Sequence, residues 1–290
     1  MNFFVREFKI SFLAFIICSL LFSACPSPKN ETNIKPTPQI PIEIPKTKTT
    51  NEIKANCLVR AYPDFLKNAE NNVVNWKDSS QMIFDDGVQP SDYETMLNTA
   101  DLNDQMAQCY PKADDYLKKL VQNYDPGRAR NEAFFFKMYG NSAEEIEKKL
   151  VPIVWMPKNI NKTIRVTGVN GIDKKFKQIS DELDNLPPEF MKYLQNPAGT
   201  FNWRVIAGTT RQSTHSFGTT IDINVALSHY WRNASPDANG IYQYQNQIPL
   251  EIVRVFEKNG FIWGGKWYHY DTMHFEYRPE LLDTECICKE

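Results

Sequence analysis

The feature that most constrains this chain is a set of two histidines and two aspartates in its last third. The motif Ser-Thr-His-Ser-Phe-Gly-Thr-Thr-Ile-Asp ends at Asp222, and Asp-Thr-Met-His ends at His274 about fifty residues later. His215, Asp222 and His274 are the donor types that a catalytic zinc ion takes from a protein, with a fourth position left for water. Asp271 then remains as a base that is not itself a ligand. Two of the four histidines of the chain lie in this pattern.

A histidine and an aspartate seven residues apart also occur by chance, so the local context matters. Gly218 lies between them and permits a tight turn with positive φ. Residues 220–224 alternate between polar and apolar side chains, as a half-buried strand does. An aspartate between Ile221 and Ile223 is costly to bury unless a cation or hydrogen bonds compensate. From these residues alone, a metal site and a chance pattern both stay open.

Short strands and amphipathic helices are expected throughout residues 151–290. Apolar residues recur at intervals of three and four over residues 171–186, and residues 249–259 begin with a proline and are followed by a glycine, so both segments are predicted to be helices. Alternation predicts strands at residues 151–155, 164–169, 202–207, 220–224, 261–264 and 273–277. The expected fold class is α+β, a small antiparallel sheet backed by helices.

Residues 56–150 are expected to form a mostly helical region that precedes this sheet. Apolar residues recur at helical spacing towards Gly140, and an Asp-Pro-Gly turn interrupts them. A compact group of Arg128, Arg130 and Glu132 follows that turn. We interpret the group as the ion-paired start of a helix, with a functional role as the alternative.

Residues 1–24 have the features of a signal peptide. Arg6 and Lys9 precede an apolar stretch of thirteen residues that ends at Phe22, which is too short to span a bilayer. Cys25, directly after Ser-Ala, resembles the lipidated cysteine of a bacterial lipoprotein box, although Phe22 stands where leucine is usual. Ordinary signal cleavage is the alternative.

Residues 25–55 are expected to be a proline-rich tether. Six prolines lie among Lys, Thr and Asn between residues 26 and 45, and no aromatic residue accompanies them. Such a segment buries too little apolar surface to fold on its own. With a lipid on Cys25, it would hold an exported domain at the cell envelope, on its periplasmic or surface face.

The net charge bears on the ligands that the protein could bind, and the remaining cysteines bear on its disulfides. Loss of the signal peptide changes the formal net charge from −2 to −3, which gives no electrostatic case for nucleic acid. Apart from Cys18 and Cys25, the chain has four cysteines, and this even number suggests two disulfides in an exported protein. A bridge between Cys286 and Cys288 would strain the backbone, so each is expected to pair with Cys57 or Cys109. A monomer is expected.

Together these motifs resemble the zinc D-alanyl-D-alanine carboxypeptidases and dipeptidases and the L-alanyl-D-glutamate endopeptidases of bacterial cell-wall metabolism. The resemblance covers roughly Asn170 to Glu280. It includes the segment Phe-Asn-Trp-Arg that ends at Arg204 and the run Trp-Gly-Gly-Lys-Trp that ends at Trp267. The resemblance implies a hedgehog-like fold and a zinc peptidase domain over residues 151–290.

The resemblance also implies a role for each residue of the site. His215, Asp222 and His274 would hold one Zn²⁺ ion. Asp271 would be the general base that takes a proton from the attacking water, and Arg204 would orient the substrate or stabilise the oxyanion. The partner implied is the stem peptide of peptidoglycan.

Other residues near the motif have competing interpretations. Arg211 is the alternative to the arginine of the family, or else a solvated charge in a loop. Ser213 is expected to hold the ring of His215 through a hydrogen bond. His229 and His269 are interpreted as ordinary, partly packed imidazoles rather than ligands.

The chain departs from the family at two positions. Thr220 stands where the family usually has Ala, and Asp271 replaces the Glu of the carboxypeptidase branch, whereas the endopeptidase branch typically carries Asp. The expected function is therefore hydrolysis of a stem-peptide bond, as a D-alanyl-D-alanine carboxypeptidase or an L-alanyl-D-glutamate endopeptidase. The alternative is a non-catalytic, zinc-retaining envelope lipoprotein that binds wall peptide. Asp271 favours the enzyme, since a binding protein has no need of a base.

Overall fold

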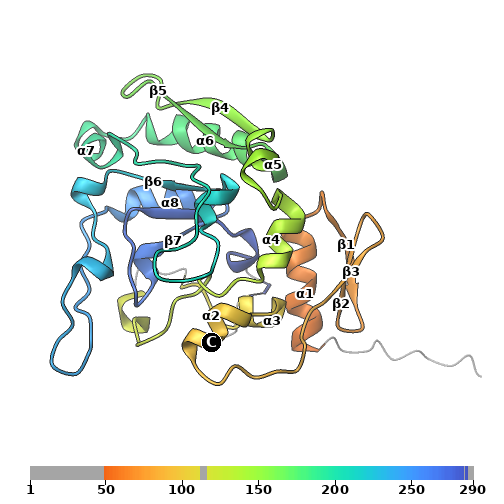
Figure 1. The fold of residues 1–290 in the computed structure, drawn as a ribbon. Helices are drawn as coiled ribbons and strands as arrows, with labels where there is room; N and C mark the ends of the chain where they lie inside the picture. The colour runs from red at the N-terminus through yellow and green to blue at the C-terminus, as the bar shows by residue number, and fades with distance from the viewer. Residues whose placement is uncertain (1–48, 112–115, 284, 287–290) are drawn as a thin grey trace, which may run out of the picture. The chain divides into compact units, whose positions relative to one another are not determined.

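Three small antiparallel sheets and the helices around them form the part of the chain that the computed structural model describes (Figure 1). The described residues are 49–111, 116–283, 285 and 286, and they belong to one structural unit, residues 47–290. The predicted signal peptide, Cys25 and most of the predicted tether lie outside the described residues.

The helices and strands are short. The α-helices of the described residues are α1 (Thr50–Ala61), α2 (Tyr93–Thr99), α3 (Leu102–Gln105), α4 (Glu132–Tyr139), α5 (Ala143–Glu147), α6 (Ile172–Leu183), α7 (Met191–Leu194) and α8 (Leu250–Lys258). The strands there are β1 (Leu66–Glu70), β2 (Val73–Trp76), β3 (Gln81–Ile83), β4 (Leu150–Trp155), β5 (Lys162–Thr167), β6 (Thr220–Asp222), β7 (Phe261–Trp263) and β8 (His274–Tyr277). None of the helices in this part of the chain has the length and apolar character that a membrane span requires.

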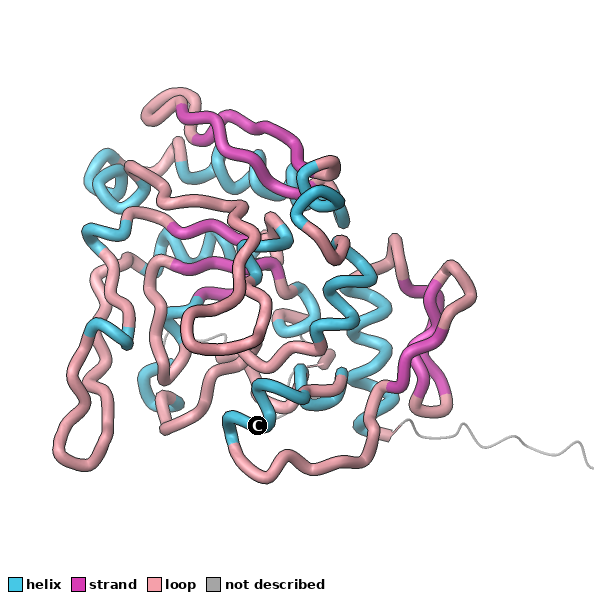
Figure 2. The backbone as a smooth tube through the Cα atoms, in the orientation of Figure 1, coloured by secondary structure: helices cyan, strands magenta, loops and turns pink. Residues whose placement is uncertain are grey.

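The sheet at the centre of the fold has the order β6-β8-β7, with both neighbours antiparallel to β8 (Figure 2). Helix α8 packs against β7, and α6 contacts α8 and the hairpin of β4 and β5. The ring of Phe256 in α8 stacks on Phe275 of β8, with centroids 3.9 Å apart. The predicted α+β fold, a small antiparallel sheet backed by helices, is confirmed.

The N-terminal region contains a sheet that the sequence analysis missed. Residues 66–83 form β1, β2 and β3, so the region from 56 to 150 is less helical than expected. Asn71 and Asn72 make the turn between β1 and β2 with φ of 51° and 63°, a left-handed conformation that asparagine tolerates. Val74 and Trp76 of β2 are buried. The three strands read Leu-Lys-Asn-Ala-Glu, Val-Val-Asn-Trp and Gln-Met-Ile, and none of them alternates strictly between polar and apolar residues.

The predicted strand at residues 202–207 was wrong. Only a single β-bridge, between Val205 and Gln212, forms there. The buried hydroxyl of Ser216 accepts a hydrogen bond from the Arg204 N–H at 3.0 Å and lies 3.0 Å from the Arg204 carbonyl oxygen. The rest of the segment bonds to the backbone that follows it, from the Asn202 N–H to the His215 carbonyl at 3.1 Å and from the Ile206 N–H to the Arg211 carbonyl at 2.9 Å. Because the Arg204 N–H donates to the Ser216 hydroxyl, this pairing is irregular and no strand forms.

Residues 56–150 and residues 151–290 share one hydrophobic core. The ring of Tyr62, directly after α1, meets Phe134 of α4 edge to face at 5.5 Å and Tyr277 of β8 at 6.4 Å. The N-terminal region therefore packs directly against the sheet that contains His274.

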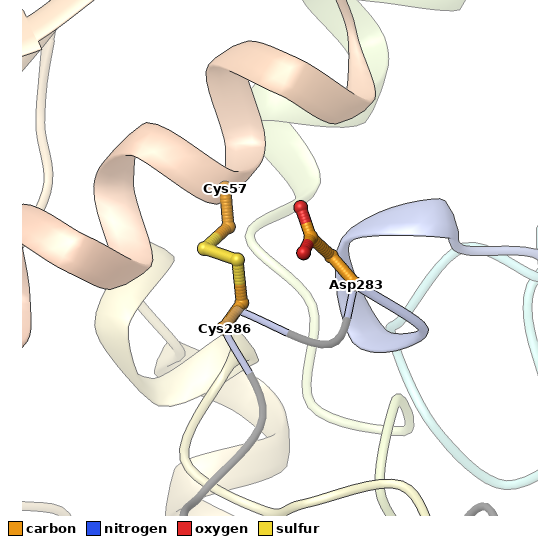
Figure 3. A group of neighbouring side chains, drawn as sticks. All are labelled: Cys57, Asp283 and Cys286. Atoms are coloured by element: carbon orange, nitrogen blue, oxygen red, sulfur yellow. A yellow bond between two sulfur atoms is a disulfide. The ribbon is translucent and has the colours of Figure 1, made fainter.

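A disulfide joins α1 to the C-terminal end of the described chain. Cys57 and Cys286 are bonded although they are 229 positions apart in sequence, and Asp283 lies beside them (Figure 3). This is one of the expected pairings. Cys109 is also disulfide-bonded, and its expected partner Cys288 lies outside the described residues. Because the two sulfurs of the first bridge bind each other, they are not available to hold a metal ion with Asp283.

We expect the Cys57–Cys286 bridge to contribute strongly to stability, because it closes a loop of more than two hundred residues. Replacing both cysteines by serine should lower the free energy of unfolding by roughly 2–5 kcal/mol. Denaturant unfolding of the double variant and the wild type, both without reductant, measures the difference. The double variant leaves no free thiol that could exchange with the bond at Cys109. A change below about 0.5 kcal/mol, typical of neutral surface substitutions, would show that the bridge does not stabilise the fold.

Candidate metal centre

Three side chains from separate segments converge at the end of the central sheet. His215 lies in the 3₁₀ turn Thr214–Phe217, Asp222 ends β6 and His274 begins β8. One carboxylate oxygen of Asp222 lies 3.2 Å from His215 Nε2, and the other lies 3.0 Å from His274 Nδ1. The ligand atoms of all three residues lie within 4.8 Å of one another, so they could hold one metal ion.

The local fold explains why the three meet. Asp222 and His274 are direct partners in the antiparallel pairing of β6 and β8, and side chains at such positions lie on the same face of a sheet. Gly218 ends the turn of His215 with φ of +66°, as its position in the sequence predicted. A Cβ atom there would lie 2.7 Å from Leu150 Cδ2 and 3.1 Å from the backbone nitrogen of Thr167. Only glycine therefore fits between the turn and the β4–β5 hairpin.

Glu276 is a residue of the site that the sequence analysis missed. Its Oε2 lies 3.1 Å from His274 Nε2 and 3.9 Å from a guanidinium nitrogen of Arg130, and its Oε1 lies 3.2 Å from Arg278. A carboxylate on the second nitrogen of a ligand histidine fixes the tautomer and orientation of the ring. The two-residue period of a strand was the available signal, since it places Glu276 on the same face as His274.

The charges of the cluster shift the pKa values strongly. Burial alone would lower the pKa of His274, but hydrogen bonds to Asp222 and Glu276 outweigh it and raise that pKa to about 10. Burial would raise the pKa of Asp222, but the charges and hydrogen bonds of His215 and His274 hold it well below its usual range. The same carboxylates that stabilise a proton on His274 would stabilise a metal cation in its place.

Asp271 lies next to this cluster, and its carboxylate has few hydrogen-bond partners. Its backbone N–H donates to the carbonyl of Gly264 at 2.9 Å, which fixes the position of the residue. Its Oδ1 is buried and has no hydrogen-bond partner among the described residues. Burial, and then the negative charge of Asp222, raise the pKa of Asp271 to about 6. A buried carboxylate oxygen without a donor is suited to a cation or a water molecule.

A pocket of about 330 Å³ opens onto the cluster and is lined by both candidate arginines. Arg204 is exposed, and its guanidinium contacts only the carbonyl oxygen of Val205, at 3.4 Å, among the described residues. Arg211 instead donates to Glu94 at 2.9 Å and to Asn98 at 2.8 Å, both on α2. Arg204 is thus the arginine available to a ligand.

Ser213, His229 and His269 were the other residues with an expected role near the motif. Ser213 is buried in the pocket wall, but no hydrogen bond joins its hydroxyl to His215 in the described structure. His229 and His269 lie outside the cluster and contact Gln247 and Asp125 instead, as expected for packed imidazoles.

The two tryptophans of the Trp-Gly-Gly-Lys-Trp run differ in role. Trp263 is fully buried in the core, whereas Trp267 lines the pocket and lies 5.7 Å from the ring of His274.

Residues 207–277 match a family model described as D-alanyl-D-alanine carboxypeptidase. The suspected family is thereby confirmed. The matched segment includes the three candidate ligands and Asp271, and it supports a peptidase of this family. No curated protein and no solved structure gave a significant match to the chain.

We expect Gly218→Ala to destabilise the fold more than Gly171→Ala. Both glycines have nearly the same positive φ, +66° and +64°, but a Cβ at Gly171 meets nothing within 4 Å. Both variants should lose about 1–2 kcal/mol from backbone strain. Gly218→Ala should lose a further 1–3 kcal/mol or so from the clash with Leu150 and Thr167. Urea unfolding of the two variants measures the difference, and equal losses would show that the close approach at Gly218 is unimportant.

Proposed function

We propose that this protein is a zinc-dependent peptidase that hydrolyses a bond in the stem peptide of peptidoglycan. The observation that carries the proposal is the convergence of His215, Asp222 and His274 within 4.8 Å, with a buried and unpartnered oxygen of Asp271 beside them. The match to a peptidase family over the same segment supports it.

The donor set fits zinc. Two imidazoles and one carboxylate are a common ligand set for catalytic zinc, and Glu276 supplies the carboxylate that usually supports a ligand histidine. When bound, a zinc ion lowers the pKa of its water ligand and polarises the carbonyl of the substrate.

The other side chains would act directly on water and substrate. Asp271 would take the proton of the attacking water, since its pKa of about 6 in the structure lies close to neutrality. Arg204, exposed at the pocket, would bind a carboxylate of the substrate or the developing oxyanion through its planar guanidinium.

The bond that is cleaved is either D-alanyl-D-alanine, at the end of the stem, or L-alanyl-D-glutamate, near its start. Asp271 in place of Glu favours the endopeptidase. We further propose that the protein is exported, that a lipid on Cys25 anchors it to the envelope, and that it works as a monomer. The alternative is a non-catalytic lipoprotein that binds wall peptide. Cleavage of purified stem peptide by the zinc-loaded protein would exclude it.

We expect about one zinc ion per chain, and we expect its loss when His215 or His274 is replaced by alanine. His229→Ala is the matched control, because that histidine lies outside the cluster, and it should keep the metal. Glu276→Gln should weaken zinc binding by roughly 10–100-fold, because the ring of His274 loses the carboxylate that orients it. Elemental analysis gives the content, and competition with a chelator gives the affinity. Zinc retained in both His→Ala variants would rule out the assigned site.

We expect Asp271→Asn to keep the fold and the zinc but to lower kcat by roughly 10²–10⁴-fold, the usual contribution of a positioned base. The loss should appear in kcat rather than KM, because proton transfer acts in the transition state. Purified stem peptide is the substrate, and mass spectrometry of the products identifies the bond. The exposed Asp181→Asn makes the same chemical change away from the site and should be neutral.

Two outcomes of this assay would contradict the mechanism. Wild-type kcat in Asp271→Asn would show that another group is the base. A zinc-loaded wild type that binds stem peptide without cleaving it would establish the non-catalytic alternative.

A further inference from the structure

The pocket at the metal cluster is far more basic than the rest of the chain. Three carboxylates line it, those of Asp222, Asp271 and Glu276. The five arginines that line it are Arg128, Arg130, Arg204, Arg211 and Arg232. The whole chain has a net charge of −2, so the excess of positive charge is local. Such a pocket favours an anionic ligand.

Most of these arginines are already engaged. Arg130 pairs with Glu276, Arg211 pairs with Glu94, and Arg232 donates to the carbonyl oxygen of Ala207 at 2.7 Å. Arg204, to which the proposed function already assigns a ligand, is exposed. That leaves one further arginine of the pocket, Arg128, to explain.

Arg128 is held in place but its charge is not directly paired. One terminal nitrogen donates to the carbonyl oxygen of His269 at 2.8 Å, and the guanidinium stacks on the ring of Trp267 at 4.7 Å. Its Nε is buried and has no hydrogen-bond partner among the described residues, and no carboxylate there forms a salt bridge with it. A buried N–H of this kind is costly unless a ligand or water satisfies it.

The turn that presents Arg128 is fixed at several points. Trp267 Nε1 donates to the carbonyl of Pro126 at 2.7 Å, and Arg278 donates to the carbonyl of Gly127 at 2.6 Å. Gly127 has φ of +98°, and a Cβ there would lie 2.5 Å from the side chain of Ile262. The guanidinium is thus set before any ligand arrives, which reduces the entropy lost on binding.

The position of Arg128 relates it to the metal cluster. The indole of Trp267 on which it stacks also lies 5.7 Å from the ring of His274. The positive charge of Arg128 also acts on Asp271 and helps to restrain the rise in the pKa of that carboxyl. Arg128 therefore belongs to the same pocket wall as the cluster, although it lies far outside the matched segment 207–277.

We propose that Arg128 binds a second carboxylate of the substrate, distinct from the group that Arg204 binds, and so selects peptides that carry at least two carboxylates. The inference rests on the proposed function and narrows its substrate class. The planar guanidinium, stacked on an indole and still offering N–H groups, suits a carboxylate better than a neutral amide.

The test measures binding separately from cleavage. The probes are the stem pentapeptide, which contains both candidate bonds, and its forms in which one carboxylate at a time is converted to the amide. Calorimetry gives Kd in the zinc-loaded Asp271→Asn protein, with and without Arg128→Gln. We expect Arg128→Gln to raise the Kd of the free-acid peptide by about 10–100-fold, the usual loss for a charged hydrogen bond. The amide form that lacks the carboxylate bound by Arg128 should have the same Kd with and without Arg128→Gln.

Three further variants sharpen the result. In the Arg204→Gln protein, the loss of affinity should disappear with the amide form of a different carboxylate, or with none of the amide forms. Arg165→Gln removes the same charge from an exposed position on β5 and should change no Kd. Arg128→Lys keeps the charge but loses the planar fork and should fall between wild type and Arg128→Gln.

Two outcomes with Arg128→Gln overturn the assignment, and two outcomes with the wild type also do so. Arg128→Gln could weaken the free acid and every amide form by the same factor, which would mean that Arg128 only balances the charges of Asp125 and Asp271. It could also leave every Kd unchanged. A wild type that binds the free acid through Arg128 but never cleaves it would contradict the proposed peptidase and leave this assignment intact. A wild type that cleaves free-acid and amide peptides equally would contradict the role of Arg128 and leave the proposed peptidase intact. A wild type that binds no stem peptide would contradict both the role of Arg128 and the proposed peptidase.

Discussion

The buried carboxylate of Glu276 is the group on which the rest of the site depends. It is only 1% exposed, and it contacts His274, Arg130 and Arg278 at once. A buried charge is costly unless it is paired, and removing one partner of such a pair typically costs about 3–5 kcal/mol. Because Arg130 comes from the N-terminal region, that region has to pack on the sheet before Glu276 is satisfied. The burial of Glu276 thus links the geometry of a candidate metal ligand to the assembly of the whole fold.

Strand β8 and the residues after it extend this arrangement. Charged and polar side chains lie at every second position, His274, Glu276, Arg278 and Glu280, and they are buried under the N-terminal region. Glu280 accepts hydrogen bonds from Arg278 at 2.6 Å and from Tyr62, directly after α1, at 2.8 Å. The alternate positions, beginning with Phe275, face the apolar core. One two-residue alternation therefore builds the site on one face of the strand and the core on the other.

The sequence predicts the local parts of this structure well, because periodicity over ten or more residues is unambiguous. It located α6, α8 and the strands of the central sheet, and it grouped His215, Asp222 and His274. It missed β1 to β3, whose sequences do not alternate between polar and apolar residues. It also missed the contact of Arg130 with Glu276, because the two residues are far apart in sequence and only the packing of the N-terminal region brings them together. The strand predicted at 202–207 was wrong for another reason, since this segment pairs only irregularly with residues 211–215 and its Arg204 N–H donates to the hydroxyl of Ser216.

The family match covers only part of the site, because several pocket residues lie before residue 207. Residues 207–277 contain the candidate ligands, Asp271 and Glu276, so the proposed metal site and the proposed base are local to that segment. Arg128, Arg130 and Arg204 lie before it. A turn fixed by Trp267 and Arg278 can change its side chain at position 128 without disturbing the metal cluster, because those anchoring hydrogen bonds go to backbone carbonyls. A side chain at position 128 can therefore differ while the metal cluster keeps its geometry.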